Sequence, residues 1–203
     1  MDAFALIFSI GGGVFVAIAL RIAYRTGQVR ERLRQQAVRA LPTACGDTDL
    51  TLYFSIPNYA ASGNFGGVSM AVEPFDGSVA VPCRRLDDLV ADAEVGLMKV
   101  DVEGFELDAL NGAEATIDRC WPLLYVENDR IEKSEALIDW IRAKDYRLWC
   151  HVPPLYNQVN YFGEAEDIKS VHSINIHCVP REQVVPEYGL HEIVSNRHPL
   201  AQE

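Results

Sequence analysis

Positions 3–20 are eighteen consecutive uncharged residues, and an apolar run of this length restricts the fold more than any other feature of the chain. Its large apolar side chains are distributed around all sides of a helix, so a helix here needs a bilayer or a deep protein core. Such a helix would be about 27 Å long, close to the lower limit for crossing a bilayer. Six of the chain's 18 basic residues follow within nineteen positions: Arg21, Arg25, Arg30, Arg32, Arg34 and Arg39.

Two interpretations of this segment remain open. In the first, residues 3–20 are a single membrane anchor, and the arginines after them keep the rest of the chain on the cytoplasmic face of the membrane. In the second, the protein is soluble and cytoplasmic, with a buried strand, a turn at Gly11 and Gly13 and a helix from Val14, the outline of a nucleotide-binding unit. A cleaved signal peptide fits less well, because Asp2 precedes the run and no Lys or Arg does.

The composition fits one globular domain with a hydrophobic core. The chain has 203 residues, of which 49% are hydrophobic, and its net charge is −11. A chain this acidic repels phosphate backbones, so nucleic acid is not an expected partner. The five cysteines include no C-x-x-C pair, so we expect reduced core cysteines and neither a disulfide framework nor a structural metal site.

Beyond residue 40 the sequence alternates between strand and helix patterns. The predicted strands are residues 50–56, 79–83, 95–100, 121–126, 146–150 and 171–179, and the predicted helices are 86–91, 105–113 and 133–143. This order favours an α/β fold with a mostly parallel sheet that helices cover on both faces. The last strand has no crossover helix before it and is therefore expected to be antiparallel. Three segments follow: an N-terminal segment 1–39, a domain 40–182 and a tail 183–203.

Acidic residues follow two of the predicted strands. Asp101 and Glu103 come after the strand at 95–100, and Glu127 and Asp129 come after the strand at 121–126. In open α/β sheets the ligand crevice lies at the carboxyl ends of the strands, where carboxylates can bind hydroxyls, amines or cations or act as general bases. The same residues are equally typical of helix starts, where they cap the backbone. Both interpretations remain open, and Ser134 is expected to cap the helix at 133–143 in the same way.

One longer stretch resembles a known family. The sequence LMKVDVEGFEL at 97–107, followed by LNGA at 110–113, is similar to the signature of the FkbM family of S-adenosylmethionine-dependent methyltransferases. Further similarities are ACGD at 44–47, GNFGG at 63–67, RLDDL at 85–89, PLLYVENDR at 122–130 and WCHVPPLYN at 149–157. The resemblance implies a class I methyltransferase-like (Rossmann-like) fold. It also implies methyl transfer from S-adenosylmethionine to a hydroxyl of a sugar or small natural product, which makes a small-molecule acceptor the expected partner.

The resemblance also implies site residues. The proton acceptor and its surroundings are expected among Asp101, Glu103 and His151, with Asp101 first. Asp47 is expected at the edge of the cofactor, and Asn64 and Glu127 are expected to contact the acceptor.

The N-terminal part departs from the family pattern. Members usually have D-x-G-x-x-x-G at the end of the first strand, whereas residues 9–15 read SIGGGVF. Gly11 and Gly13 are the cofactor-binding candidates in that loop. No ribose-binding strand is recognisable, because residues 21–39 carry a basic, helix-like pattern. We therefore expect an incomplete N-terminal part and weak or lost cofactor binding. The alternative function is that of a truncated, non-catalytic relative that serves as a binding module or is a gene fragment.

Overall fold

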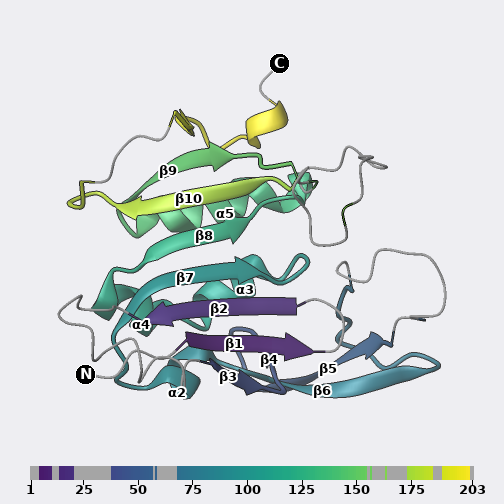
Figure 1. Cartoon of the computed structure of the whole chain (residues 1–203). Helices are drawn as coiled ribbons and strands as arrows, with labels where there is room; N and C mark the ends of the chain where they lie inside the picture. Colours follow the sequence, from purple (N-terminus) through teal and green to yellow (C-terminus); the bar gives the residue numbers. More distant parts are fainter. Residues whose placement is uncertain are drawn as a thin grey trace. The chain divides into compact units, whose positions relative to one another are not determined.

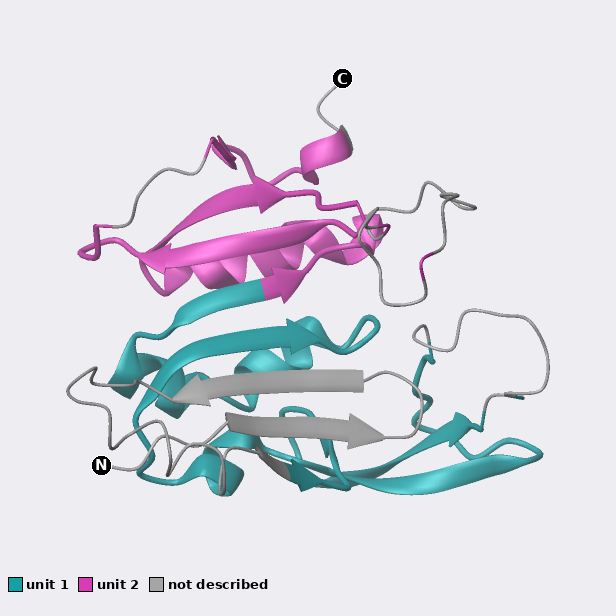
Figure 2. Ribbon diagram, in the orientation of Figure 1, with its two compact units in different colours: residues 1–125 teal, residues 126–203 magenta. Residues whose placement is uncertain are grey.

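The computed structural model of the chain (Figure 1) describes residues 5–10, 14–20, 38–56, 58, 68–154, 156, 163, 173–184 and 189–201. Before residue 40 it describes the backbone alone. The chain divides into two compact units, residues 1–125 (unit 1) and residues 126–203 (unit 2), which Figure 2 distinguishes by colour.

The N-terminal apolar run forms two strands of unit 1. Strand β1 (Ala5–Ile10) pairs antiparallel with β2 (Val14–Leu20), and β2 in turn pairs antiparallel with β7 (Val95–Asp101). On its other side β1 pairs in parallel with β3 (Val38–Leu41), so the strand order is β7-β2-β1-β3.

Both interpretations of this run are therefore corrected. The expected anchor helix over residues 3–20 is wrong, because the described parts of the run are strands, and the expected helix from Val14 is also wrong. Short apolar runs of β-branched and aromatic residues separated by glycines favour strands, and periodicity alone cannot tell such runs from a buried helix. None of the helices in the described parts of the chain combines the length and apolarity that a membrane span requires. Gly11 and Gly13 lie outside the described residues.

A second, small sheet belongs to unit 1. It consists of β4 (Ala44–Cys45), β6 (Ser78–Arg84) and β5 (Leu50–Ser55) in that order, with β5 antiparallel and β4 parallel to β6. Its buried side chains form one hydrophobic cluster: Ala44, Leu52, Phe54, Val81 and Cys83. The partly buried Phe105, from the segment after β7, packs against this cluster.

The described residues of unit 1 also form three short helices: α2 (Leu86–Val90), α3 (Glu106–Asn111) and α4 (Glu114–Cys120). The start of α4 is held by a residue distant in sequence. The carboxylate of Asp87 accepts hydrogen bonds from the backbone N–H groups of Ala115 and Thr116, at 3.2 and 2.8 Å, and from the Thr116 hydroxyl at 2.7 Å. Because the first N–H groups of a helix have no partner within it, Asp87 satisfies donors that would otherwise be unpaired.

In its described residues, unit 2 contains the helix α5 and strands in the order β11-β9-β10-β8. Its elements are β8 (Leu123–Glu127), which crosses the boundary between the units, α5 (Ile131–Ala143), β9 (Tyr146–His151), β10 (Asn175–Pro180), β11 (His191–Glu192) and the 3-10 turn η1 (Pro199–Ala201). Figure 1 shows β10 running opposite to both β8 and β9. Helix α5 buries the apolar side chains of Leu137, Ile138 and Ile141.

These pairings confirm an α/β fold with mixed sheets. The antiparallel last strand expected at 171–179 is confirmed as β10. The mostly parallel order is not what unit 1 shows, because β2 runs antiparallel to both of its neighbours. Parallel strands need a long crossover connection, which is usually a helix. A helix was expected after Gly13, and the strand β2 takes its place.

The backbone at Gly46 lies close to Gly112, the C-cap of α3. A Cβ atom on Gly112 would lie 1.9 Å from the carbonyl oxygen of Gly46. Its φ of −71° is ordinary, so space rather than conformation requires glycine here.

We predict that Gly112→Ala destabilises the protein by about 3 kcal/mol, because the loop at Gly46 has to move. The control is Gly77→Ala. Gly77 has φ +75° and open space around a Cβ, so this change costs only about 1 kcal/mol of backbone strain. Denaturant titration of both variants measures the difference, and equal losses would contradict the close approach.

Candidate functional site

The segment that joins β7 to α3 carries two of the predicted site residues. In this β7–α3 turn (residues 101–106), Asp101 ends the strand, and Glu103 and Gly104 follow with φ of +52° and +98°. Positive φ is uncommon for a residue other than glycine, and such residues concentrate at functional sites. The structure therefore brings Asp101 and Glu103 together in one tight turn.

The last glutamate of the motif holds this turn. Glu106 is 5% exposed, and its Oε1 accepts the N–H of Gly104 at 2.9 Å and makes a longer contact of 3.4 Å with the N–H of Val102. Helix α3 has no side-chain hydrogen bond at its N-cap, Phe105. Neither Asp101 nor Glu103 occupies the N-cap position of α3, and the carboxylate that binds the backbone N–H groups of this turn is that of Glu106.

Two residues that the sequence analysis did not select lie beside Asp101. The ammonium group of Lys99 forms an ion pair with Oδ2 of Asp101. Burial, and secondly the charge of Asp101, raise the pKa of Tyr125, so its phenol keeps its proton at neutral pH and can donate a hydrogen bond. The sequence did contain a signal for Tyr125. Side chains alternate between the two faces of β8, so Tyr125 lies on the face opposite to the buried Leu124 and Val126.

Asp47 lies elsewhere in unit 1. Its carboxylate accepts the hydroxyl of Thr48 at 3.1 Å, and its carbonyl is 3.5 Å from a guanidinium nitrogen of Arg85. The preceding residue, Gly46, faces Gly112 at the end of α3, whereas Asp101 and Glu103 precede the start of that helix. Six helical residues span about 9 Å, so the structure does not bring Asp47 into the β7–α3 turn.

In unit 2, the β8–α5 turn (residues 127–130) is fixed to the start of β10. The N–H of Asn128 donates to the carbonyl of Ile174 at 2.7 Å, and the N–H of Ile174 donates to Oδ1 of Asp129 at 2.6 Å. Asp129 therefore does not cap α5. The expected cap at Ser134 is also wrong, because Ser134 lies inside α5, where its Oγ accepts Nδ2 of Asn128 at 2.9 Å.

His151 lies at the same end of unit 2. It is the last residue of β9, and its partner in the antiparallel register is Asn175, which follows Ile174. His177 lies on the same face of the sheet, and burial together with the nearby His151 lowers its pKa. The structure thus brings His151 and the β8–α5 turn to one end of unit 2, with a second histidine that the sequence analysis did not connect to it.

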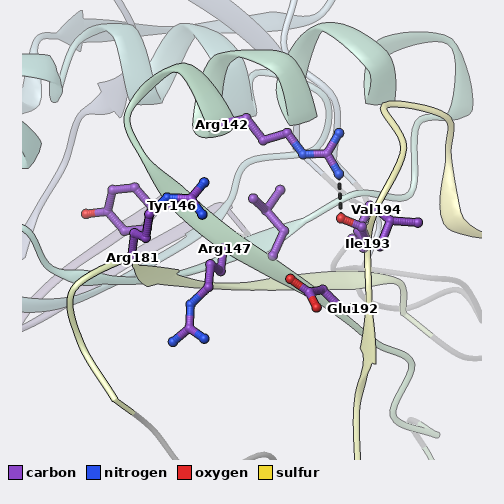
Figure 3. A pocket seen from close by; sticks show the side chains of 8 residues that line it. Arg142, Tyr146, Arg147, Arg181, Glu192, Ile193 and Val194 are labelled. Carbon is purple, nitrogen blue, oxygen red and sulfur yellow. Dashed lines mark hydrogen bonds between the residues drawn. The ribbon is translucent and has the colours of Figure 1, made fainter.

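A groove of about 360 Å³ lies at the opposite end of β9 (Figure 3). Its lining residues are Arg142, Tyr146, Arg147, Leu148, Arg181, Glu192, Ile193 and Val194. The guanidinium groups hold chain segments together: one donates to the carbonyl of Ile193, the second to that of Gln183, and the third to the carboxylate of Asp145. In Figure 3 they do not converge on a common point. Within unit 2, the groove therefore lies at the other end of β9 from His151.

Of the remaining predicted residues, Asn64, Gly11 and Gly13 lie outside the described part of the chain. Glu127 opens the β8–α5 turn and is partly exposed.

Comparison with known proteins identifies the family. The model of the methyltransferase FkbM domain matches residues 3–148. A solved structure of a methyltransferase FkbM from Methylobacillus flagellatus KT is similar, with 17% identity and a TM-score of 0.42, over 74% of this chain and 32% of its own. The chain thus spans about a third of that protein's length. No curated protein matches the chain. Because the domain match covers well over half of its residues, the chain belongs to the FkbM methyltransferase domain family.

Proposed function

We propose that the chain is an S-adenosylmethionine-dependent O-methyltransferase that acts on a hydroxyl of a sugar or small natural product. The observation that carries this proposal is the match to the FkbM domain over residues 3–148, which includes the β7–α3 turn. That turn presents Asp101 and Glu103 at a strand end, on a backbone with positive φ at Glu103.

In this proposal Asp101 is the general base. S-adenosylmethionine, when bound, would supply an electrophilic methyl group for the acceptor oxygen and would leave as the neutral thioether. The carboxylate of Asp101 accepts the proton of the acceptor hydroxyl, and the ion pair with Lys99 fixes its position. Tyr125 donates a hydrogen bond from its phenol to a polar group of a bound molecule.

The described residues fit the cofactor in part. The carboxylates of the β7–α3 turn and the phenol of Tyr125 are suited to the hydroxyl and amino groups of S-adenosylmethionine. Residues Val14–Leu20 form a strand antiparallel to β7 rather than the expected helix, so no helix N-terminus is available there to bind the cofactor. The strand in place of this helix favours weak cofactor binding. For this reason the second candidate function is that of a non-catalytic relative that serves as a binding module.

We propose further roles for residues of each unit, taken separately. In unit 2, His151 is proposed as a second proton acceptor and Glu127 as a contact for acceptor hydroxyls. In unit 1, Asp47 is proposed at a cofactor edge. The expected partner is a small hydroxyl-bearing molecule and not a nucleic acid, because the chain carries a net charge of −11.

We predict that the full chain transfers tritium from S-adenosylmethionine labelled at the methyl group to at least one member of a panel of sugars and small hydroxyl compounds. Asp101→Asn should lower the rate about 100-fold or more, because the base is lost while size and shape are kept. Asp76→Asn is the matched control, since Asp76 is exposed in a turn before β6, and it should leave the rate unchanged. Equal rates for both variants would refute the assignment of Asp101, and no transfer by the wild-type chain would favour the non-catalytic candidate.

A second prediction separates function from stability at Glu103. Glycine tolerates the φ of +52° that costs other residues about 1 kcal/mol. Glu103→Gly should therefore leave the free energy of unfolding equal or higher, while methyl transfer falls.

The contrast for this prediction is Gly104→Ala, which imposes strain at a φ of +98° and should destabilise the protein. Denaturant titration and the methyl-transfer assay decide between the outcomes. A destabilised Glu103→Gly variant with full activity would show that Glu103 has only a structural role.

A further inference from the structure

The last described segment of the chain runs along helix α5. This C-terminal strap (residues 193–200) begins where Arg142, near the end of α5, donates a hydrogen bond to the carbonyl of Ile193. Further on, Nδ2 of Asn196 donates to Oε1 of Glu135, in the first half of the helix, at 3.1 Å. The strap therefore follows α5 from its end back towards its start, where the β8–α5 turn lies.

At this point the strap inserts a buried histidine. His198 is 3% exposed. Its Nδ1 accepts the N–H of Leu200 at 3.2 Å, and its Nε2 lies 3.0 Å from the carbonyl oxygen of Asn128. Because Nδ1 uses its lone pair as an acceptor, the proton of the neutral ring is on Nε2, which donates to Asn128.

The acceptor of this hydrogen bond stands between two acidic residues of the β8–α5 turn. Asn128 follows Glu127 and precedes Asp129, and two contacts tie this turn to Ile174: the N–H of Asn128 donates to the carbonyl of Ile174, and the N–H of Ile174 donates to the carboxylate of Asp129. His198 adds a further anchor, from a different part of the chain, at the carbonyl of Asn128. The strap lies outside residues 3–148, which the FkbM domain matches.

We propose that His198 is a positioning residue, which orients the β8–α5 turn, and with it the carboxylate of Glu127, for contact with the methyl acceptor. This proposal rests on the proposed function. His198 itself acts only through the carbonyl of Asn128.

Hydrogen exchange of the full chain tests the positioning directly. In His198→Ala the amides of Asn128 and Ile174 should exchange about tenfold faster, because the turn loses one anchor. His198→Gln retains an N–H near the place of Nε2 and should restore slow exchange. The side chain of His198→Asn reaches only the place of Nδ1, so this variant should show the same fast exchange as His198→Ala. It replaces His198→Ala in the test if the alanine variant folds poorly.

The matched control is Asn196→Ala, which removes a strap contact to α5 without touching the turn. It should leave both amides unchanged. Unchanged exchange of Asn128 and Ile174 in His198→Ala would overturn the proposal. So would equal acceleration of the amides between β9 and β10, since this would mean general destabilisation.

Methyl transfer supplies the functional readout on the same variants. With the acceptor found in the panel, His198→Ala should raise the KM for that acceptor about tenfold at nearly constant kcat, and His198→Gln should rescue it. A fall in kcat without a change in KM would contradict the proposal that His198 positions the turn for contact with the methyl acceptor. If the wild-type chain transfers no methyl group, the proposed function fails, while the exchange data still decide whether His198 orients the turn.

Discussion

The buried carboxylate of Glu106 is the interaction on which the candidate site depends. A carboxylate that is 5% exposed would cost several kcal/mol without partners. It finds them in backbone N–H groups of the β7–α3 turn, in which Glu103 and Gly104 adopt positive φ. The next residue, Phe105, packs against the small sheet. Glu106 thus ties the end of β7 to the start of α3, and Phe105 ties the same turn to the small sheet, so that Asp101 and Glu103 lie on a turn fixed by two side chains.

The sequence predicts this part well, because its motif encodes a local structure. The strand–turn–helix order from β7 to α3, the strand β8 and the helix α5 follow from patterns of apolar residues within short windows. The structure of the N-terminal apolar run (residues 3–20) does not follow from such a pattern. An apolar segment with glycines in its middle is compatible with a spanning helix, a β-turn-α unit or two strands, and only pairing with β7 and β3 selects the strands.

Other features depend on contacts that no local pattern reveals. Asp87 precedes the N–H groups that it caps by 28 and 29 residues, and Gly112 is glycine because Gly46 approaches it. His198 follows Asn128, whose carbonyl it binds, by 70 residues. In each case the residue type is compatible with an ordinary surface or helix position, so its role is visible only once the fold brings the partner close. Lys99 and Tyr125 are different cases, because Lys99 lies two positions before Asp101 in β7 and the alternation of β8 separates Tyr125 from its buried neighbours.

Calorimetric titration of the full chain with S-adenosylmethionine is the sharpest test of the proposed methyl transfer. Losing one charge-assisted hydrogen-bond pair of the kind that holds the ribose costs about 1.5–3 kcal/mol, or about ten- to a hundredfold in affinity. We therefore expect saturable binding that is clearly weaker than low micromolar, and we expect a Glu106→Leu variant to lose this binding as the β7–α3 turn opens. No binding by a folded wild-type chain at millimolar cofactor would contradict it.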